Sequence, residues 1–182
     1  MEKRSSAKMS TKKLCILAML IALFVVLDYY ATIFSIGLGG GIKISFSGLP
    51  VILASMLFGP IAGMVVGLLG SFTGQMLTYG FGPTTLLWIL PAGIRGLSMG
   101  LLFSAFGKSI KFRHLITEIV ISSLLVTAAN TLVIYLDSVI LGYFSMEVVF
   151  GMLVARLISA LITAVVYSAI VLLVYRPVKK LV

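Results

Sequence analysis

The chain has 182 residues, of which 60% are hydrophobic and only 10% charged, and its mean hydropathy is +1.21. This apolar content exceeds what a soluble globular domain needs, and it predicts a single all-α integral membrane domain over residues 1–182. The net charge of +9 comes largely from short basic clusters that flank apolar runs, which are topology signals and not a nucleic-acid surface.

The apolar runs divide into six membrane spans, because a helix needs about 20 apolar residues to cross the hydrocarbon core. The first is expected at about 13–34, followed by a glycine-rich outer connection at about 35–46 that is either a loop or a short re-entrant piece. The motif FGP at 58–60 breaks the next run, since proline disfavours helix in the residue before it. The other five spans are expected at about 47–58, 60–79, 84–106, 114–137 and 146–176.

Six crossings place both termini on one side of the membrane. The basic clusters at the N-terminus, at 107–114 and near the C-terminus then all fall on that side, and the opposite connections contain only Lys43. The positive-inside rule predicts that this side, with both termini, is cytoplasmic.

The sequence offers no catalytic motif. The segment GLLFSAFGKS at 100–109 resembles a phosphate-binding loop, but Gly100 and Gly107 are too far apart for that motif and an expected membrane helix precedes it. The chain has one histidine, His114, and one cysteine, Cys15, so no cluster suited to a catalytic metal is visible. We therefore expect a protein that is not an enzyme, holds no metal and needs no cofactor.

Ionisable residues inside the spans indicate a binding site, because an arginine at a helix centre costs about 2.5–3.5 kcal/mol on insertion scales. At about 1.5 Å of rise per residue, Arg95 is expected about 16 Å and Arg156 about 15 Å below the outer surface. Asp28 and Asn130 fall in the outer half, whereas the inner half of every helix is expected to be apolar. This distribution predicts a cavity that opens outward.

The polar and aromatic side chains at these depths suit an anionic ligand with a flat, hydrogen-bonding ring. A guanidinium binds carboxylate in a bidentate manner, and a carboxylate such as Asp28 accepts two N–H bonds from an aminopyrimidine edge. The expected binding residues are Asp28, Lys43, Gln75, Tyr79, Trp88, Arg95, Asn130, Tyr135 and Arg156.

Structural roles are the alternatives for several of these residues. The two arginines would pair with Asp28 and Asp137 as structural ion pairs. Trp88 would be an anchor at the membrane interface, and Lys43 a solvated loop residue. Asn130 would be a hydrogen-bonding contact between helices.

Small residues predict close packing of the third span. Because glycine has no Cβ, it lets the backbones of two helices approach each other closely in a membrane. Glycines recur at Gly59, Gly63 and Gly67, followed by Gly70 and Gly74.

Three features together resemble a known family. They are the A-x-x-x-A pattern of LAMLIAL at 17–23, the glycine-rich first outer connection, and the stretch KISFSGLPVILASMLFGPIAGMVVGLLG at 43–70. With six short-looped helices, they resemble the substrate-binding S components of energy-coupling factor (ECF) vitamin transporters, and among these most closely the folate-specific members.

The resemblance implies a bacterial plasma-membrane protein that binds folate with high affinity and works with a membrane coupling (T) subunit and two cytosolic ATPase (A) subunits. The alanine motif by which the family contacts the coupling subunit corresponds to Ala18 and Ala22, and the family's gating loop corresponds to about 35–44. The alternatives are the same family with pantothenate or another vitamin as ligand, and a stand-alone channel or secondary carrier for small anions.

Overall fold

The computed structural model describes residues 10–37, 45–151 and 153–181, although not the side chains of 34–37, 155 and 181. In the described part, all regular secondary structure is α-helix, as expected for a chain that must satisfy its backbone hydrogen bonds inside a bilayer. The helices are α1 (Thr11–Gly37), α2 (Gly48–Phe58), α3 (Pro60–Thr78), α4 (Thr85–Ala105), α5 (Phe112–Ile140), α6 (Met146–Phe150) and α7 (Leu153–Leu181).

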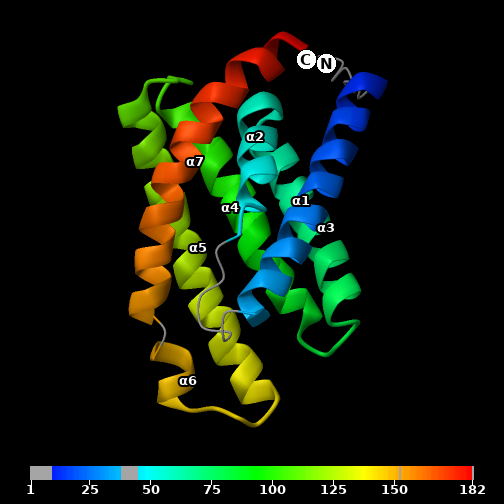
Figure 1. Ribbon diagram of the computed structural model, residues 1–182, viewed down its shortest axis with the longest axis vertical. Helices are drawn as coiled ribbons and strands as arrows, with labels where there is room; N and C mark the ends of the chain where they lie inside the picture. The colour runs from blue at the N-terminus through cyan, green and yellow to red at the C-terminus, as the bar shows by residue number, and fades with distance from the viewer. Residues whose placement is uncertain (1–9, 38–44, 152, 182) are drawn as a thin grey trace, which may run out of the picture.

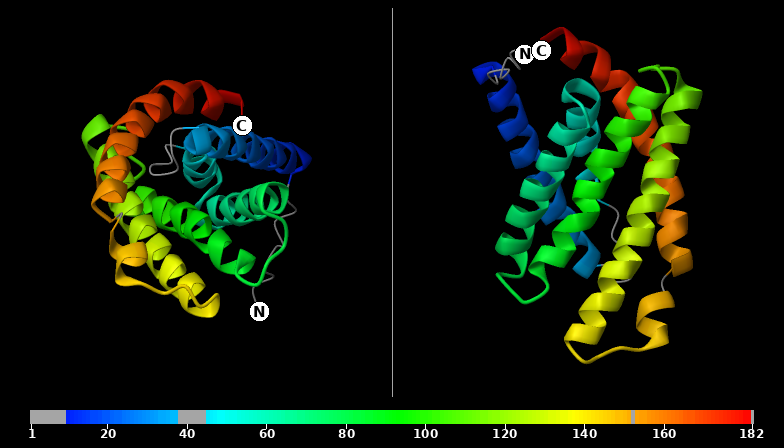
Figure 2. Two further views of the ribbon diagram at one scale, coloured as in Figure 1. Left: turned by 60° about the horizontal axis from the view of Figure 1, so that its bottom comes forward. Right: turned by 180° about the vertical axis from the view of Figure 1, so that it is seen from behind.

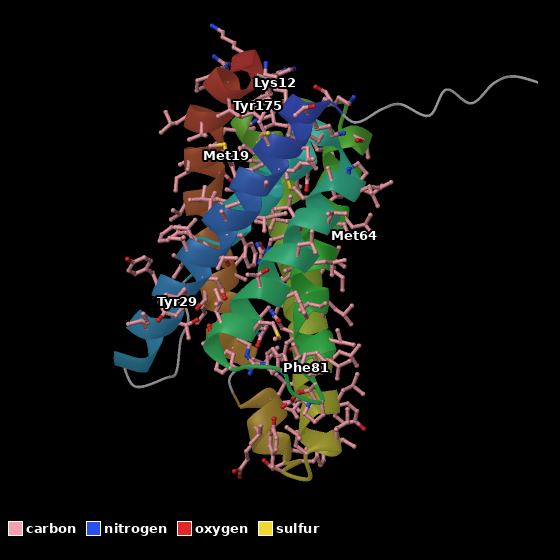
Figure 3. All side chains as sticks on the ribbon, turned by 90° about the vertical axis from the view of Figure 1, so that its right-hand side faces the viewer. Lys12, Met19, Tyr29, Met64, Phe81 and Tyr175 are labelled. Atoms are coloured by element: carbon pink, nitrogen blue, oxygen red, sulfur yellow. The ribbon has the colours of Figure 1, made fainter. Side chains whose placement is uncertain are left out.

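The helices run along the long dimension of the molecule in alternating directions (Figure 1). The start of α1, the end of α7 and the connection between α4 and α5 lie at one end, which we call the basic end (Figure 1). Figure 3 shows Lys12 and Tyr175 at this end and Phe81 toward the opposite one. Among the described residues, five helices are long and apolar enough to span a membrane, and α2 is a shorter apolar helix. The predicted six-span arrangement with both ends of the bundle on one side is therefore confirmed.

The second span is short. With 11 residues, α2 is about 16 Å long, which is roughly half of the hydrocarbon core. It occupies the half of the bundle nearest the basic end (Figure 1), where it is almost entirely buried. The start of α2 at Gly48 therefore lies near the middle of the molecule and not at its outer surface.

The prediction of one continuous helix over 146–176 is wrong. The segment forms a five-residue helix, α6, and a separate helix, α7, which begins at Leu153. Ser145 caps α6, since its Oγ accepts a hydrogen bond from the backbone N–H of Val148 at 3.2 Å. Gly151 follows the end of α6 in a turn, consistent with its low helix propensity. Arg156 therefore lies in the first turn of α7, and its depth does not follow from counting residues from Met146.

The third and fourth spans pack backbone against backbone, as the glycine pattern predicts. A Cβ added to Gly67 on α3 would lie 2.2 Å from the carbonyl oxygen of Ala92 on α4, and one added to Gly96 would lie 2.2 Å from the carbonyl carbon of Gly63. Neither position has room for a side chain. The right-hand view of Figure 2 shows the two helices side by side.

A hydrophobic core closes the half of the bundle toward the basic end. Helices α2, α4, α5 and α7 contribute to it, and we call it the inner core. Its fully or largely buried members are Ile52, Leu53, Met56, Met99, Phe103, Leu115, Ile119, Ala164, Tyr167, Val171 and Tyr175.

Candidate functional site

A cavity of about 800 Å³ lies between the helices, on the side of the inner core away from the basic end. Its walls come from α1, α3, α4, α5 and α7, and from the chain just before and at the start of α2. The volume is within the usual range for small-molecule sites in proteins. Among the expected binding residues, those lining the cavity are Asp28, Gln75, Tyr79, Trp88, Arg95, Asn130 and Arg156.

Trp88 is held in the cavity wall by its indole N–H. Its Nε1 donates to Oδ1 of Asp137 at 3.1 Å, and Asp137 is only 5% exposed. The Tyr143 hydroxyl donates to the other carboxylate oxygen, and the Thr84 side chain also hydrogen-bonds to Asp137. The hydrogen bond to this carboxylate raises the pKa of Tyr143, which lies in the connection between α5 and α6, above its ordinary value. The indole has one donor and it is used here, so the ring orientation is fixed.

These contacts bear on two of the alternative roles. Asp137 accepts from Trp88 and Tyr143, so the structure does not support Asp137 as the partner of an arginine. The Trp88 N–H, in turn, points at a buried carboxylate, whereas an interfacial anchor would direct it to the headgroup layer. Trp88 is thus part of the cavity wall.

Arg95 lies at the deep end of the cavity. Its guanidinium carbon is 5.9 Å from the ring centroid of Tyr167, within the range of a cation–π contact. The Tyr167 hydroxyl donates to the backbone oxygen of Ser45. A Cβ on Gly48 would lie 2.8 Å from the Tyr167 ring and 3.2 Å from Nη1 of Arg95, so glycine is what lets α2 begin here.

Arg156, on α7, lines the same cavity as Arg95. Its Nη1 atom is buried and has no hydrogen-bonding partner among the described residues. A buried guanidinium N–H without a partner is costly, because folding removes its water and returns nothing. Two cationic side chains therefore line one cavity, and one of them has an unused donor.

Asp28 brings a carboxylate to the cavity from α1. Its Oδ1 accepts hydrogen bonds from Ser45 Oγ at 3.4 Å and from Ser47 Oγ at 3.3 Å. These serines precede α2, and both line the cavity. The connection between α1 and α2 thus reaches into the site with its last residues, just before α2 begins.

Two of the expected binding residues are not placed in the cavity. Tyr135 is 43% exposed and packs edge-to-face on Phe144, with 5.6 Å between ring centroids. The cavity-lining face of α5 carries Asn130 and Ile134, and the residue after Ile134 points about 100° away from it. Lys43 lies outside the described residues, as does most of the expected gating loop.

Sequence reasoning missed three contributors to the site. Tyr167 could have been found, because Ser159 and Thr163 share its helix face at intervals of four residues and all three line the cavity. Ser45 and Ser47 had no such signal, because their position depends on how far the chain before α2 folds inward.

The expectation that the inner half of every helix is apolar is wrong. Glu118, on the second turn of α5, is 0% exposed, and Ser98 and Ser122 form a buried hydroxyl pair at 2.8 Å. Isolated polar residues in the segment HLITEIVISSLL do little to lower its average hydropathy, which is why the segment still qualifies as a span.

Comparisons with known proteins identify the family. The model of the family described as "ECF transporter, substrate-specific component" matches residues 12–175. A solved structure, described as "Structure and mechanism of the S component of a bacterial ECF transporter", is 24% identical, with a TM-score of 0.56, over 93% of this chain and 96% of its own. No curated protein is significantly similar. The chain therefore belongs to the family of substrate-specific components of ECF transporters.

Proposed function

We propose that the cavity binds an anionic vitamin with a flat ring, and that folate is the ligand it fits best. The observation that carries this proposal is the pair Arg95 and Arg156 in one cavity, with Arg156 Nη1 lacking a partner among the described residues. Guanidinium groups favour carboxylates, which they bind through paired N–H donors. Folate has two carboxylates, so each arginine has a group to bind.

The ring end of the ligand is assigned to Trp88 and Asp28. The Trp88 ring is fixed through Asp137, so it offers a flat apolar face at little entropic cost. Asp28 supplies a carboxylate that accepts N–H bonds from an aminopyrimidine edge, which the pterin of folate presents. Pantothenate has one carboxylate and no ring, and so uses fewer of these groups.

In this proposal the protein delivers its ligand by docking on a membrane coupling subunit that two cytosolic ATPases drive. Ala18 and Ala22 are both exposed on α1, consistent with a surface where another helix approaches closely. The basic end is proposed to face the cytoplasm of a bacterium, since the described part of the chain concentrates its lysines there.

The chain contains a single tryptophan, Trp88, and this makes a direct test possible. Purified protein in detergent is titrated with folate and, separately, with pantothenate, while tryptophan fluorescence is recorded. Folate is expected to quench the emission with saturation, and pantothenate to leave it unchanged. The same preparation, purified from folate-rich cells, is expected to show the absorbance of a co-purified pterin.

Two outcomes contradict the proposal at different levels. Saturable binding of pantothenate without binding of folate refutes the ligand choice and leaves the vitamin-binding role intact. Passage of small anions across liposomes that contain this chain alone, without the ATPases, refutes the binding-subunit role and favours a channel or carrier.

A further inference from the structure

Glu118 is a second buried ionisable group, separate from the cavity. It is 0% exposed, and neither carboxyl oxygen has a hydrogen-bonding partner in the part of the chain that the structure describes. Leu115 and Ile119, on the same face of α5, are also 0% exposed and belong to the inner core. Buried polar groups in proteins are nearly always hydrogen-bonded, so this side chain requires an explanation.

The surroundings of Glu118 decide its charge. An ionised carboxylate in an apolar core without a partner is far more costly than the neutral acid. No described cation forms an ion pair with it. The titratable residue of α4 is Arg95, which lies over the Tyr167 ring. On α7, the buried Tyr175 packs against Phe103 at 6.0 Å between ring centroids.

The remaining titratable groups on these elements are elsewhere. Helix α2 carries none, and Glu147 is on α6 at the opposite end of the bundle. Arg156 is at the cavity, and His114 is exposed and packs on Phe106. On α5, on α7 and in the connection between α4 and α5, the other charged residues at the basic end are exposed: Lys108, Lys111, Arg113, Arg176, Lys179 and Lys180.

Serine hydroxyls lie between the helix turn that carries Glu118 and the ligand cavity, although none of them hydrogen-bonds to Glu118. Ser122, one turn further along α5, hydrogen-bonds to Ser98 on α4, and Ser98 Oγ donates to the backbone oxygen of Arg95 at 3.2 Å. The next residue, Ser123, lines the cavity. The helices that enclose Glu118 are thus the ones that form the floor of the site.

We propose that Glu118 is a proton-binding site, neutral in the folded state described here, whose ionisation loosens the packing of α4, α5 and α7 below the ligand cavity. In the ionisation step the carboxyl O–H bond breaks and the proton passes to water, which must first reach the inner core. The site thereby couples hydration of the inner half of the bundle to release of one proton. This inference does not depend on which vitamin the cavity binds.

The sign of the resulting pH dependence follows from proton counting. At pH values above the ordinary pKa of glutamate, the unfolded chain exposes an ionised Glu118, whereas the buried acid of the proposed folded state keeps its proton. The folded state binds more protons, so stability falls as pH rises, and the folding equilibrium constant decreases by up to about tenfold per pH unit.

The test measures thermal unfolding of the full chain in detergent from about pH 5 to about pH 9 for the wild type, E118Q and E147Q. Glutamine keeps the shape and the hydrogen-bond donor of the neutral acid but does not ionise. E118Q is expected to remove most of the pH slope. E147Q, at an exposed position on α6, is the matched control and is expected to keep the wild-type slope. Equal slopes for wild type and E118Q overturn the proposal.

Infrared spectroscopy gives a second measurement that does not require E118Q to fold. The wild type at neutral pH is expected to show the carbonyl stretch of a protonated carboxylic acid, and D137N is expected to keep it. Absence of the band in the wild type, or its loss in D137N, shows that Glu118 is not the protonated group and overturns the proposal.

Discussion

Replacement of Arg156 by methionine is expected to weaken ligand binding and, at the same time, to stabilise the protein without ligand. The guanidinium has a buried Nη1 with no partner among the described residues, and an unsatisfied buried donor costs about 1–3 kcal/mol. Methionine is unbranched and flexible, so it fills the same space without a donor. The free energy of unfolding of the ligand-free protein should therefore rise by about 1 kcal/mol or more.

The effect on binding has the opposite sign. Truncation of one member of a buried, hydrogen-bonded charge pair costs about 2–5 kcal/mol. Because about 1.4 kcal/mol corresponds to a factor of ten in Kd, the loss at the lower limit is about 30-fold. The Kd is measured by quenching of Trp88 fluorescence, and stability by thermal unfolding without ligand.

A matched control is available in Arg113→Met, because Arg113 is exposed on α5 near the basic end. It is expected to change neither quantity. If Arg156→Met binds the vitamin as tightly as the wild type, Arg156 is not a ligand group. If it instead lowers the stability of the ligand-free protein, the guanidinium has a structural partner, and the reasoning from an unused donor fails.

Three further predictions concern other parts of the molecule. Asp137→Ala leaves the Trp88 N–H and the Tyr143 hydroxyl without their acceptor. A shift of the tryptophan emission maximum and a loss of about 1–3 kcal/mol are expected, chiefly from the indole N–H because Tyr143 is 45% exposed, whereas Glu147→Ala should change neither. Gly67→Ala places a Cβ 2.2 Å from the Ala92 oxygen and should lower thermal stability by at least about 1 kcal/mol, while Gly82→Ala, with its nearest atom at 3.8 Å, should be nearly neutral; similar melting temperatures would contradict close α3–α4 packing. Ala18→Trp should abolish uptake in cells that contain the whole transporter while leaving vitamin binding by the purified chain unchanged, and Leu173→Trp, at a 77% exposed position on α7, should preserve both; normal uptake by Ala18→Trp would remove the assignment of the coupling surface.

The sequence predicts the helices well where length and composition decide them. Long apolar runs leave helix as the only way to satisfy the backbone in a bilayer, and the FGP motif marks the break between α2 and α3. The sequence does not predict the break between α6 and α7 at Gly151, because a glycine within an apolar run is compatible with either a helix or a turn. The sequence nevertheless predicts that Arg156 lines the cavity, because an arginine inside an apolar span is expected to face a cavity or a partner.

The site was harder to predict where it depends on orientation. Asp137 appeared as a possible partner for an arginine, yet it binds the indole of Trp88 and the hydroxyl of Tyr143, and no spacing in the sequence encodes that choice. Tyr135 is predicted from its depth alone. It follows Ile134, which lines the cavity, and its side chain therefore points about 100° away from the cavity face of α5. Glu118 is not among the predicted ionisable residues of the spans, because it lies near the basic end of its span, beside the exposed charges of the connection between α4 and α5.

The contact between α3 and α4 has a consequence for how the site responds to its ligand. Where Gly67 meets Ala92 and Gly96 meets Gly63, the backbones of α3 and α4 are in direct contact. No side chain lies between them there, so the two helices have little freedom to shift against each other. Gln75 on α3, and Trp88 and Arg95 on α4, are then expected to keep their mutual distances. The part of the cavity wall that α3 and α4 form therefore acts as a fixed template, and adjustment to the shape of a ligand falls to α1, α5 and α7.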